Sequence, residues 1–193
     1  MTHRIIAALP QKATGYPVFA YDTETQGLDA TQVLIICWEN VNTGEQYTAF
    51  SVLEFREFLE ERAPCIAYAH NGSSFDVLGI LSERELYEAE KVAAGTKVFE
   101  YKVNGVMYRD SKHLIPLPLS KVAKSVDMEK GVTPQEYIDG TVTEITQEAI
   151  DYCLLDVRIL SAALRRLKEL YADLIHRNVN EIELPYTTAS MAY

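Results

Sequence analysis

The chain has 193 residues, 48% of them hydrophobic, a length and composition that suit one domain with a buried core. No run approaches the roughly 18 consecutive apolar residues of a membrane-spanning helix, so we expect no membrane contact. Its 18 basic and 28 acidic side chains give a formal net charge of −10. This charge argues against tight stand-alone binding to duplex nucleic acid, which needs basic side chains to neutralise phosphates. It leaves open an enzyme that holds one strand end through metal ions, or one tethered to a larger DNA-binding chain.

The start of the chain and its cysteines indicate an intracellular, cytoplasmic protein. The first ten residues contain one basic residue and an apolar run of five, which is too short for a secretory signal. Cys37, Cys65 and Cys153 are odd in number, far apart in the sequence and without Cys-x-x-Cys spacing. We therefore expect three reduced, buried thiols.

The first half of the chain predicts three strands. Residues 17–21 form an apolar strand that ends at Asp22, and residues 32–38 are rich in β-branched side chains, as a central strand is. Residues 46–50 follow a turn and are expected to complete an antiparallel meander.

Helices and further strands follow. Ser51 to Glu54 matches a capping box, which predicts a helix to about Arg62. Residues 65–69 form a short buried strand, and a new helix is expected from about Ser74. The dipeptide Asn104-Gly105 between two apolar runs predicts a hairpin of residues 97–103 and 106–109.

The second half is dominated by one long helix. A short helix is expected at residues 121–125, and residues 130–143 predict a loop with one helical turn. From residue 146 to about 177, apolar side chains recur at helical spacing, and such a helix would be about 45 Å long. The recurring positions are Ile150, Leu154, Val157, Leu160, Leu164, Leu167, Tyr171 and Leu174. Strands followed by a packing helix predict an α/β domain with a mixed central sheet flanked by helices.

Asp22 and Glu24 are the first acidic pair. They lie two residues apart at a strand end, so both side chains point to one face and can reach one cation. An isolated acidic pair at such a place is usually solvated. Thr25 adds a hydroxyl that could bind a nucleotide or serve a turn or helix cap.

Asn71 and Asp76 form the second pattern, at the end of the other apolar strand. Asp76 would lie on the first turn of the next helix, over the same sheet edge; alternatively, Asn71 is a turn residue and Asp76 stabilises the helix dipole. Phe75 is either a core residue or a wedge against a terminal base. His70 could be a ligand, but we expect it to be structural.

Tyr152 and Asp156 form the third pattern, at positions i and i+4 on one helix face. A tyrosine beside a metal-bound carboxylate can hold an attacking water, although the pair could also be part of a solvated stripe. Four acids beside apolar segments most plausibly share a cation, and oxygen ligands favour Mg²⁺. The three patterns together therefore suggest a two-metal phosphodiesterase.

The order Asp-x-Glu, Asn-x₃-Phe-Asp, Tyr-x₃-Asp resembles the three motifs of the DEDD 3′–5′ exonuclease superfamily, in its tyrosine-bearing branch, over residues 17–177. The resemblance implies a ribonuclease H-like fold and two Mg²⁺ ions, with Mn²⁺ as a substitute. Asp22, Glu24 and Asp156 would hold one ion, and Asp22, with Asp76 through water, the other. Tyr152 would orient the attacking water.

Residues 110–124 resemble the stretch after the second motif in proofreading domains of family B DNA polymerases, particularly the protein-primed kind. There a serine and its neighbour touch the single strand; Ser111 matches the serine, but Lys112 stands where a hydrophobic residue is usual. A lysine and a tyrosine precede the third motif in those proteins, which makes Lys130 and Tyr137 candidates. Lys130 would neutralise the scissile phosphate, or else be a solvated loop residue.

The resemblance predicts a single metal-dependent 3′–5′ exonuclease domain, which would release nucleoside 5′-monophosphates from single-stranded or mispaired 3′ DNA ends and proofread during replication. Residues 178–193 resemble the connector to a polymerase domain. A polymerase domain or another replication protein, and a terminal protein, would be partners, in a viral, plasmid or organellar setting. An exoribonuclease and a non-catalytic binding module are the alternatives; the latter predicts a lost carboxylate, yet all four are present.

Overall fold

The computed structural model describes residues 15–28 and 32–192. The first ten residues, in which we expect no secretory signal, lie outside this part. No helix within the described residues is both long and apolar enough to cross a membrane.

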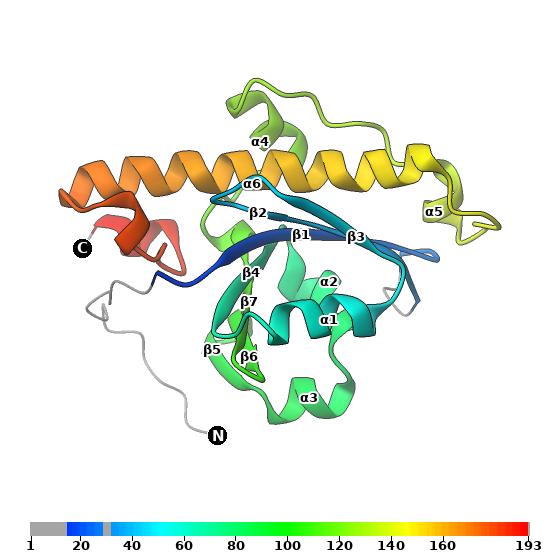
Figure 1. Cartoon of the computed structure of the whole chain (residues 1–193), viewed down its shortest axis with the longest axis horizontal. Helices are drawn as coiled ribbons and strands as arrows, with labels where there is room; N and C mark the ends of the chain where they lie inside the picture. The colour runs from blue at the N-terminus through cyan, green and yellow to red at the C-terminus, as the bar shows by residue number, and fades with distance from the viewer. Residues whose placement is uncertain (1–14, 29–31, 193) are drawn as a thin grey trace.

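Seven strands of the described chain form one mixed sheet in the order β3-β2-β1-β4-β7-β6-β5 (Figure 1). β1 pairs antiparallel with β2, and β2 with β3, so the predicted meander is confirmed. β4 runs parallel to both β1 and β7. The strands are β1 (Val18–Thr25), β2 (Val33–Asn40), β3 (Gln46–Ala49), β4 (Cys65–Ala69), β5 (Glu90–Ala94), β6 (Lys97–Val103) and β7 (Val106–Asp110).

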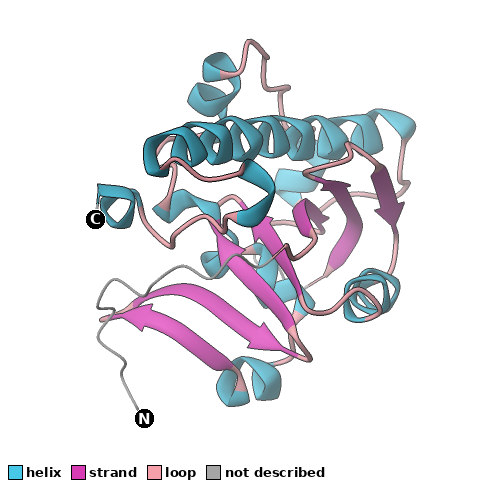
Figure 2. Cartoon of the chain, turned by 60° about the vertical axis from the view of Figure 1, so that its left-hand side comes forward, coloured by secondary structure: helices cyan, strands magenta, loops and turns pink. Residues whose placement is uncertain are grey.

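Helices cover both faces of the sheet (Figures 1 and 2). The long helix α6 crosses one face, where its apolar side chains pack on alternate residues of the strands, and α4 packs on α6. The helix α1 packs on the opposite face, beside α2. The helices are α1 (Val52–Glu60), α2 (Asp76–Ile80), α3 (Glu83–Glu88), α4 (Leu119–Ser125), α5 (Gln135–Asp139) and α6 (Gln147–Ile175). The mixed α/β class is as predicted.

Strand β1 is longer than predicted. We expected it to end at Asp22, but antiparallel pairing with β2 continues to Thr25. Its parallel pairing with β4 stops at Ala20. The second half of β1 therefore has a partner on one side only, among the described residues, and this is the part that carries the acids.

The sequence prediction placed a capping box at the wrong serine. Ser51 precedes α1 but its side chain makes no capping hydrogen bond. The capping box is instead at Ser82 and Glu85, where each side chain bonds to the backbone nitrogen of the other residue. This capping box begins α3, and the edge strand β5, which the sequence patterns did not indicate, follows α3.

The predicted hairpin and the predicted long helix are both confirmed. Asn104 and Gly105 have φ of 49° and 82°, the positive values that a two-residue hairpin turn of this kind requires. α6 begins after Thr146, whose hydroxyl accepts from the Ala149 nitrogen. Leu174, predicted to lie on its apolar stripe, is 63% exposed because it lies on the outer face of the helix with the exposed Leu170, whereas Tyr171 and Ala172 are buried.

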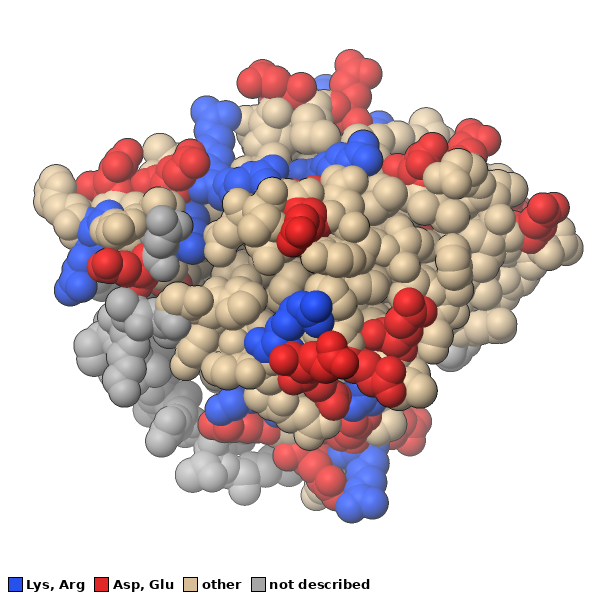
Figure 3. All heavy atoms as spheres, viewed as in Figure 1, with Lys and Arg blue, Asp and Glu red and all other residues tan. Residues whose placement is uncertain are grey.

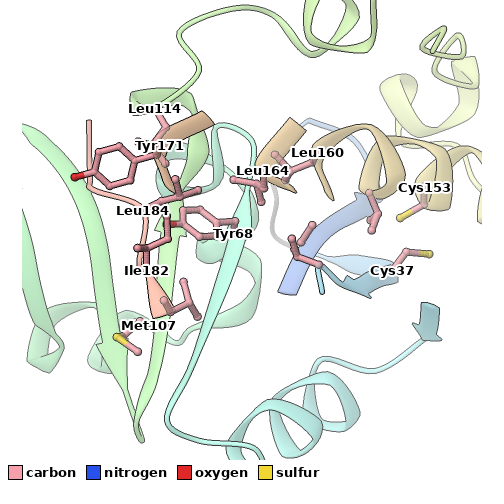
Figure 4. Close-up of a cluster of buried hydrophobic side chains, with 14 of the residues drawn as sticks. Cys37, Tyr68, Met107, Leu114, Cys153, Leu160, Leu164, Tyr171, Ile182 and Leu184 are labelled. Carbon is pink, nitrogen blue, oxygen red and sulfur yellow. The ribbon is translucent and has the colours of Figure 1, made fainter. Parts of the chain in front are cut away.

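The larger buried cluster lies between the sheet and α6 and includes part of the C-terminal tail (Figure 4). Ile182 and Leu184 are buried in it, so part of the segment that resembles a connector packs into the core. All three cysteines are buried and free, as predicted.

Arg109 fixes the tail to the sheet. Its side chain is 3% exposed, donates to Glu100 Oε2 at 2.6 Å, and pairs with Glu183. It also donates to the Leu184 carbonyl oxygen at 3.3 Å. The charges of the Glu100 and Glu183 carboxylates are thus balanced by one buried guanidinium.

We expect Arg109→Met to lower the free energy of unfolding by about 3–5 kcal/mol, because it leaves Glu100 buried without its partner. The matched variant Arg84→Met removes an exposed i,i+4 pair with Glu88 and should cost less than about 1 kcal/mol. Urea denaturation measures both; equal losses would contradict the structural role of Arg109.

Candidate metal centre

Strand β1 carries the first two acids of the site. Alternation along the strand places Asp22 and Glu24 on the face covered by α6, in line with the core residue Ala20. A carboxylate oxygen of Asp22 and one of Glu24 lie within 4.8 Å of each other. The sequence prediction that both point to one face is therefore confirmed, although they lie within the strand and not after it.

Asp76 approaches from the first turn of α2 and is 4% exposed. Its Oδ1 accepts hydrogen bonds from the Thr23 backbone nitrogen at 3.1 Å and from Thr23 Oγ1 at 2.8 Å. The turn before α2 requires Gly72, since a Cβ there would lie 2.6 Å from the Cβ of Ala69. This tight turn brings the second motif against β1.

The loop with Asn71 is held by Asp110, the last residue of β7. Asp110 Oδ1 accepts from the backbone nitrogens of Asn71 at 3.0 Å and Lys112 at 2.9 Å, and its Oδ2 accepts from Ser73 Oγ at 2.6 Å. Asn71 has φ of 71°, a left-handed conformation that asparagine tolerates. Its side-chain oxygen accepts from Lys112 Nζ at 3.0 Å.

Helix α6 supplies Tyr152 and Asp156, one turn apart. Lys130 Nζ donates to the Tyr152 phenol oxygen at 2.8 Å and pairs with Asp156 Oδ2. Thr133 Oγ1 lies 2.7 Å from the same phenol oxygen. Gly131 allows the loop to come this close, since a Cβ there would lie 3.0 Å from the Tyr152 ring. One loop therefore fixes the tyrosine hydroxyl from two sides.

The loop after β1 is joined to α5 by a contact between two glycines. Gly27 donates its backbone N–H to the Tyr137 carbonyl oxygen at 3.0 Å. A Cβ on Gly140 would lie 3.5 Å from backbone atoms of Gly27, in van der Waals contact. Gln26 Nε2 donates to the carbonyl oxygens of Gly140 at 2.7 Å and Val142 at 3.2 Å. We call this contact the glycine seam.

These elements border one open cleft with a volume of about 190 Å³. All four predicted metal-binding carboxylates line it, together with most of the predicted DNA-binding residues. The lining side chains that the sequence predicted are Asp22, Glu24, Thr25, Asn71, Phe75, Asp76, Tyr137, Tyr152 and Asp156. Three patterns separated by about 130 residues in the sequence thus meet in one place.

Burial raises the pKa of every acid in the cleft, and repulsion by the other cleft carboxylates adds to this shift at Asp22 and Glu24. Burial raises the pKa of Glu24 to about 8 and that of Asp76 to about 6. Burial, followed by the charge of Asp76, raises the pKa of Asp22 well above its ordinary range. Burial also raises the pKa of Asp156, although the Lys130 ammonium opposes this shift. A divalent cation would reverse these shifts by favouring the ionised forms.

The donor set suits a hard cation. Carboxylate oxygens are the ligands that Mg²⁺ and Mn²⁺ prefer. Asp156 Oδ1 is buried and has no hydrogen-bond partner among the residues that the structure describes. An unpaired buried carboxylate oxygen is costly, and coordination to a cation would satisfy it. The residues present therefore fit the expected metal ions.

The predicted DNA-contacting residues Thr25, Phe75 and Tyr137 differ in accessibility. Thr25 is 5% exposed and donates its hydroxyl to the Gly27 carbonyl oxygen, which is the alternative turn role. Phe75 is half-buried and borders the cleft. Tyr137 is 3% exposed, and its phenol oxygen has no hydrogen-bond partner among the described residues. The Phe75 ring is therefore more accessible to a ligand in the cleft than the Tyr137 ring.

The prediction for Ser111 needs correction. Its side chain is completely buried and lies 3.0 Å from His70 Nδ1, so it offers no surface to a DNA strand. His70 Nε2 donates to the Leu117 carbonyl oxygen at 2.8 Å, and burial lowers the histidine pKa. Both ring nitrogens of His70 thus have partners in the described chain, which fits the expected structural role, and the side chain also lines the cleft. Lys112, the neighbour of Ser111, is exposed.

Sequence patterns missed Thr23, Asp110 and Thr133. Thr23 lies between the two acids of the first motif, but only the tertiary fold shows that Asp76 accepts its hydrogen bonds. Asp110 did offer a signal, since it is an acid at the end of an apolar strand, as Asp22 is. Thr133 lies in a polar loop, where no local pattern marks a partner of Tyr152.

The raised pKa values predict how pH affects stability without divalent cations. A folded state whose acids have raised pKa values binds more protons than the unfolded state, so its stability falls as pH rises. The ordinary values are 4.5 for Glu24 and 3.8 for Asp76, and the raised ones are about 8 and about 6, so the fall should span this window. We therefore expect Tm in EDTA to fall between about pH 5 and about pH 8.

Thermal melts at several pH values measure this effect. Glu24→Gln should flatten the dependence, whereas the exposed Glu54→Gln should keep the wild-type slope. Mn²⁺ should raise Tm more at pH 8 than at pH 5, since the acids must ionise to bind it. A Tm that rises with pH in EDTA would contradict the burial of repelling carboxylates.

The comparisons with known proteins are structural. No known family profile and no curated protein matches the sequence. Phi29 DNA polymerase complexed with single-stranded DNA matches the fold with a TM-score of 0.61 at 17% identity, over 83% of this chain and 35% of that chain. Its ternary complex with primer-template DNA and incoming nucleotides gives 0.58 at 19% identity, over 86% and 35%.

The family B DNA polymerase of the hyperthermophilic archaeon Pyrobaculum calidifontis gives a TM-score of 0.60 at 18% identity, over 96% of this chain and 28% of that chain. The chain thus spans about a third of the length of the polymerases that it matches. Identities this low show the fold alone. The chain therefore shares the fold of one part of family B DNA polymerases.

Proposed function

We propose that this chain is a metal-dependent 3′–5′ exonuclease with a ribonuclease H-like fold, which removes nucleotides from 3′ ends of DNA. The observation that carries the proposal is the cleft in which Asp22, Glu24, Asp76 and Asp156 meet beside a hydrogen-bonded Tyr152. Such a constellation suits hydrolysis of a phosphodiester and has no evident use in a purely structural domain.

The four carboxylates would hold two Mg²⁺ ions, or Mn²⁺ in their place. Bound there, the ions would lower the pKa of the attacking water and stabilise charge on the leaving 3′ oxygen. Tyr152 would orient the water through its hydroxyl, which Thr133 and Lys130 already hold in place. The Lys130 ammonium, next to Asp156, would offset the negative charge of the scissile phosphate.

The context supports DNA as the substrate and replication as the process. Two of the matched structures are complexes of a DNA polymerase with single-stranded or primer-template DNA. This chain matches about a third of each. This likeness supports the proposal of a role in proofreading, beside a polymerase domain or another replication protein.

Surface charge supports a strand end, and not a duplex, as the bound form. On the face shown in Figure 3, acidic side chains gather over α1 and α3, and basic ones follow α6. The net charge of −10 argues against the broad basic surface that duplex binding requires. A terminal base must also unstack to bring its phosphate into the cleft, which costs least in single strands and at mismatches.

Substitutions test the assignment of roles. Asp22→Ala and Asp156→Ala should lower kcat by several orders of magnitude, because each removes a metal ligand, and EDTA should abolish activity until Mg²⁺ or Mn²⁺ is added. Tyr152→Phe keeps the carboxylates and should cost at most about 100-fold. The matched control is Asp151→Ala, an exposed aspartate beside Tyr152 that should keep wild-type activity.

Release of nucleotide from a 5′-labelled oligonucleotide, together with far-UV circular dichroism of each variant, measures these effects. Full activity in excess EDTA would rule out the two-metal proposal. A Tyr152→Phe variant as inactive as Asp22→Ala would show that the tyrosine does more than orient water.

Substrate form provides a second test. We expect faster nucleotide release from single-stranded and mispaired 3′ ends than from matched duplex, and weaker binding at higher salt. Product ladders from the three DNA substrates, and from a matched RNA oligomer, measure the preference. Equal rates on single strand and matched duplex, or cleavage from the 5′ end, would contradict the proofreading role, and a preference for RNA would indicate an exoribonuclease.

A further inference from the structure

A thiol lies directly behind the carboxylates of the cleft. One oxygen of Asp22, one of Glu24 and the Sγ of Cys153 all lie within 4.8 Å of one another. Cys153 is on α6 and completely buried. Its thiol donates a weak hydrogen bond to the Asp22 carbonyl oxygen over 3.6 Å. Figure 4 shows Cys153 on α6 and Cys37 on the facing strand.

Asp156 gives independent support for a ligand at this point. Its side chain is 5% exposed, and its Oδ1 is buried without a hydrogen-bond partner in the described part of the chain. Cys153 and Asp156 are three residues apart on a helix and therefore lie on one face. Asp156 lines the cleft together with Asp22 and Glu24, and the thiol lies within 4.8 Å of a carboxylate oxygen of each of these two acids.

We propose that Cys153 is an additional ligand for thiophilic divalent cations, such as Cd²⁺ or Zn²⁺, in the centre formed by Asp22 and Glu24. The inference rests on the proposed function for the centre itself but adds a ligand that hard cations do not use. Zinc binds sulfur at about 2.3 Å and carboxylate oxygen at about 2.0–2.2 Å, so both ligands fit one ion after small side-chain shifts. The thiol proton passes to solvent as the metal–sulfur bond forms.

Because of the thiol, the centre would bind hard and thiophilic cations through different sets of ligands. Mg²⁺ and Mn²⁺ would bind through oxygen atoms alone, since thiolates are poor ligands for them. Cd²⁺ and Zn²⁺ would gain a sulfur ligand, bind more tightly and leave more slowly. Such ions would therefore occupy the centre in place of Mg²⁺.

The test is a Cd²⁺ titration of the whole reduced chain, followed by the ultraviolet charge-transfer band of a cadmium–thiolate bond and by calorimetry. Wild type should show the band. Cys153→Ser should lose it, bind Cd²⁺ about tenfold more weakly or worse, and release one proton fewer on binding. The affinity for Mn²⁺ should fall far less. Cys65→Ser, which alters a buried thiol elsewhere in the core, should keep both the band and the affinity.

Several outcomes would overturn the inference. They are a wild type without the band, a band that persists in Cys153→Ser or Cys153→Ala, and a band lost only in Cys37→Ser. A wild type without the band overturns the inference even if no variant folds. A nuclease assay with Mn²⁺ separates the two proposals: activity without the band refutes the thiol ligand alone, and the band without activity refutes the nuclease alone.

Discussion

Four carboxylates in one cleft repel one another, and the surrounding structure depends on holding them there. Asp76 stays because Thr23 donates two hydrogen bonds to it, and Asp156 stays because Lys130 pairs with it. Asp22 needs no such partner to stay in place, since it belongs to a strand whose backbone is bonded to β2. The backbones of β1, α2 and α6 thus hold four negative charges close together, although these charges repel one another.

The position of α6 is fixed by a buried polar contact as well as by apolar packing. Glu39 on β2 is 3% exposed and accepts from Ser161 Oγ at 2.6 Å and from Arg165 Nη1 at 3.2 Å. Apolar side chains alone would tolerate a small slide of the helix along the sheet. Because hydrogen bonds are directional, these contacts define where Asp156 lies relative to β1.

Local sequence patterns predicted most of the fold, because residues close together in the sequence determine its turns and the alternation along its strands. The hairpin at Asn104 and the single face of Asp22 and Glu24 follow from turn chemistry and strand alternation. The sequence also brought together all four acids and Tyr152, since their order and spacing are specific. Ser111 shows the limit of local patterns, since its side chain is buried and its hydrogen-bond partner is His70, a residue 41 positions away. Partnerships of that range, such as Thr23 with Asp76, exist only once the sheet has formed.

The glycine seam limits how the length of this chain can vary. Gly27 and Gly140 lie beside each other, and two hydrogen bonds join their loops, from the Gly27 nitrogen to the Tyr137 carbonyl oxygen and from Gln26 Nε2 to the Gly140 carbonyl oxygen. An insertion in either loop would lengthen one side of this contact and separate Tyr137 from the end of β1. Natural length variation among related chains should therefore avoid both loops and occur at turns that touch neither. The turn around Gly95 is such a place, because a Cβ added there would meet no atom of the described chain within 4 Å.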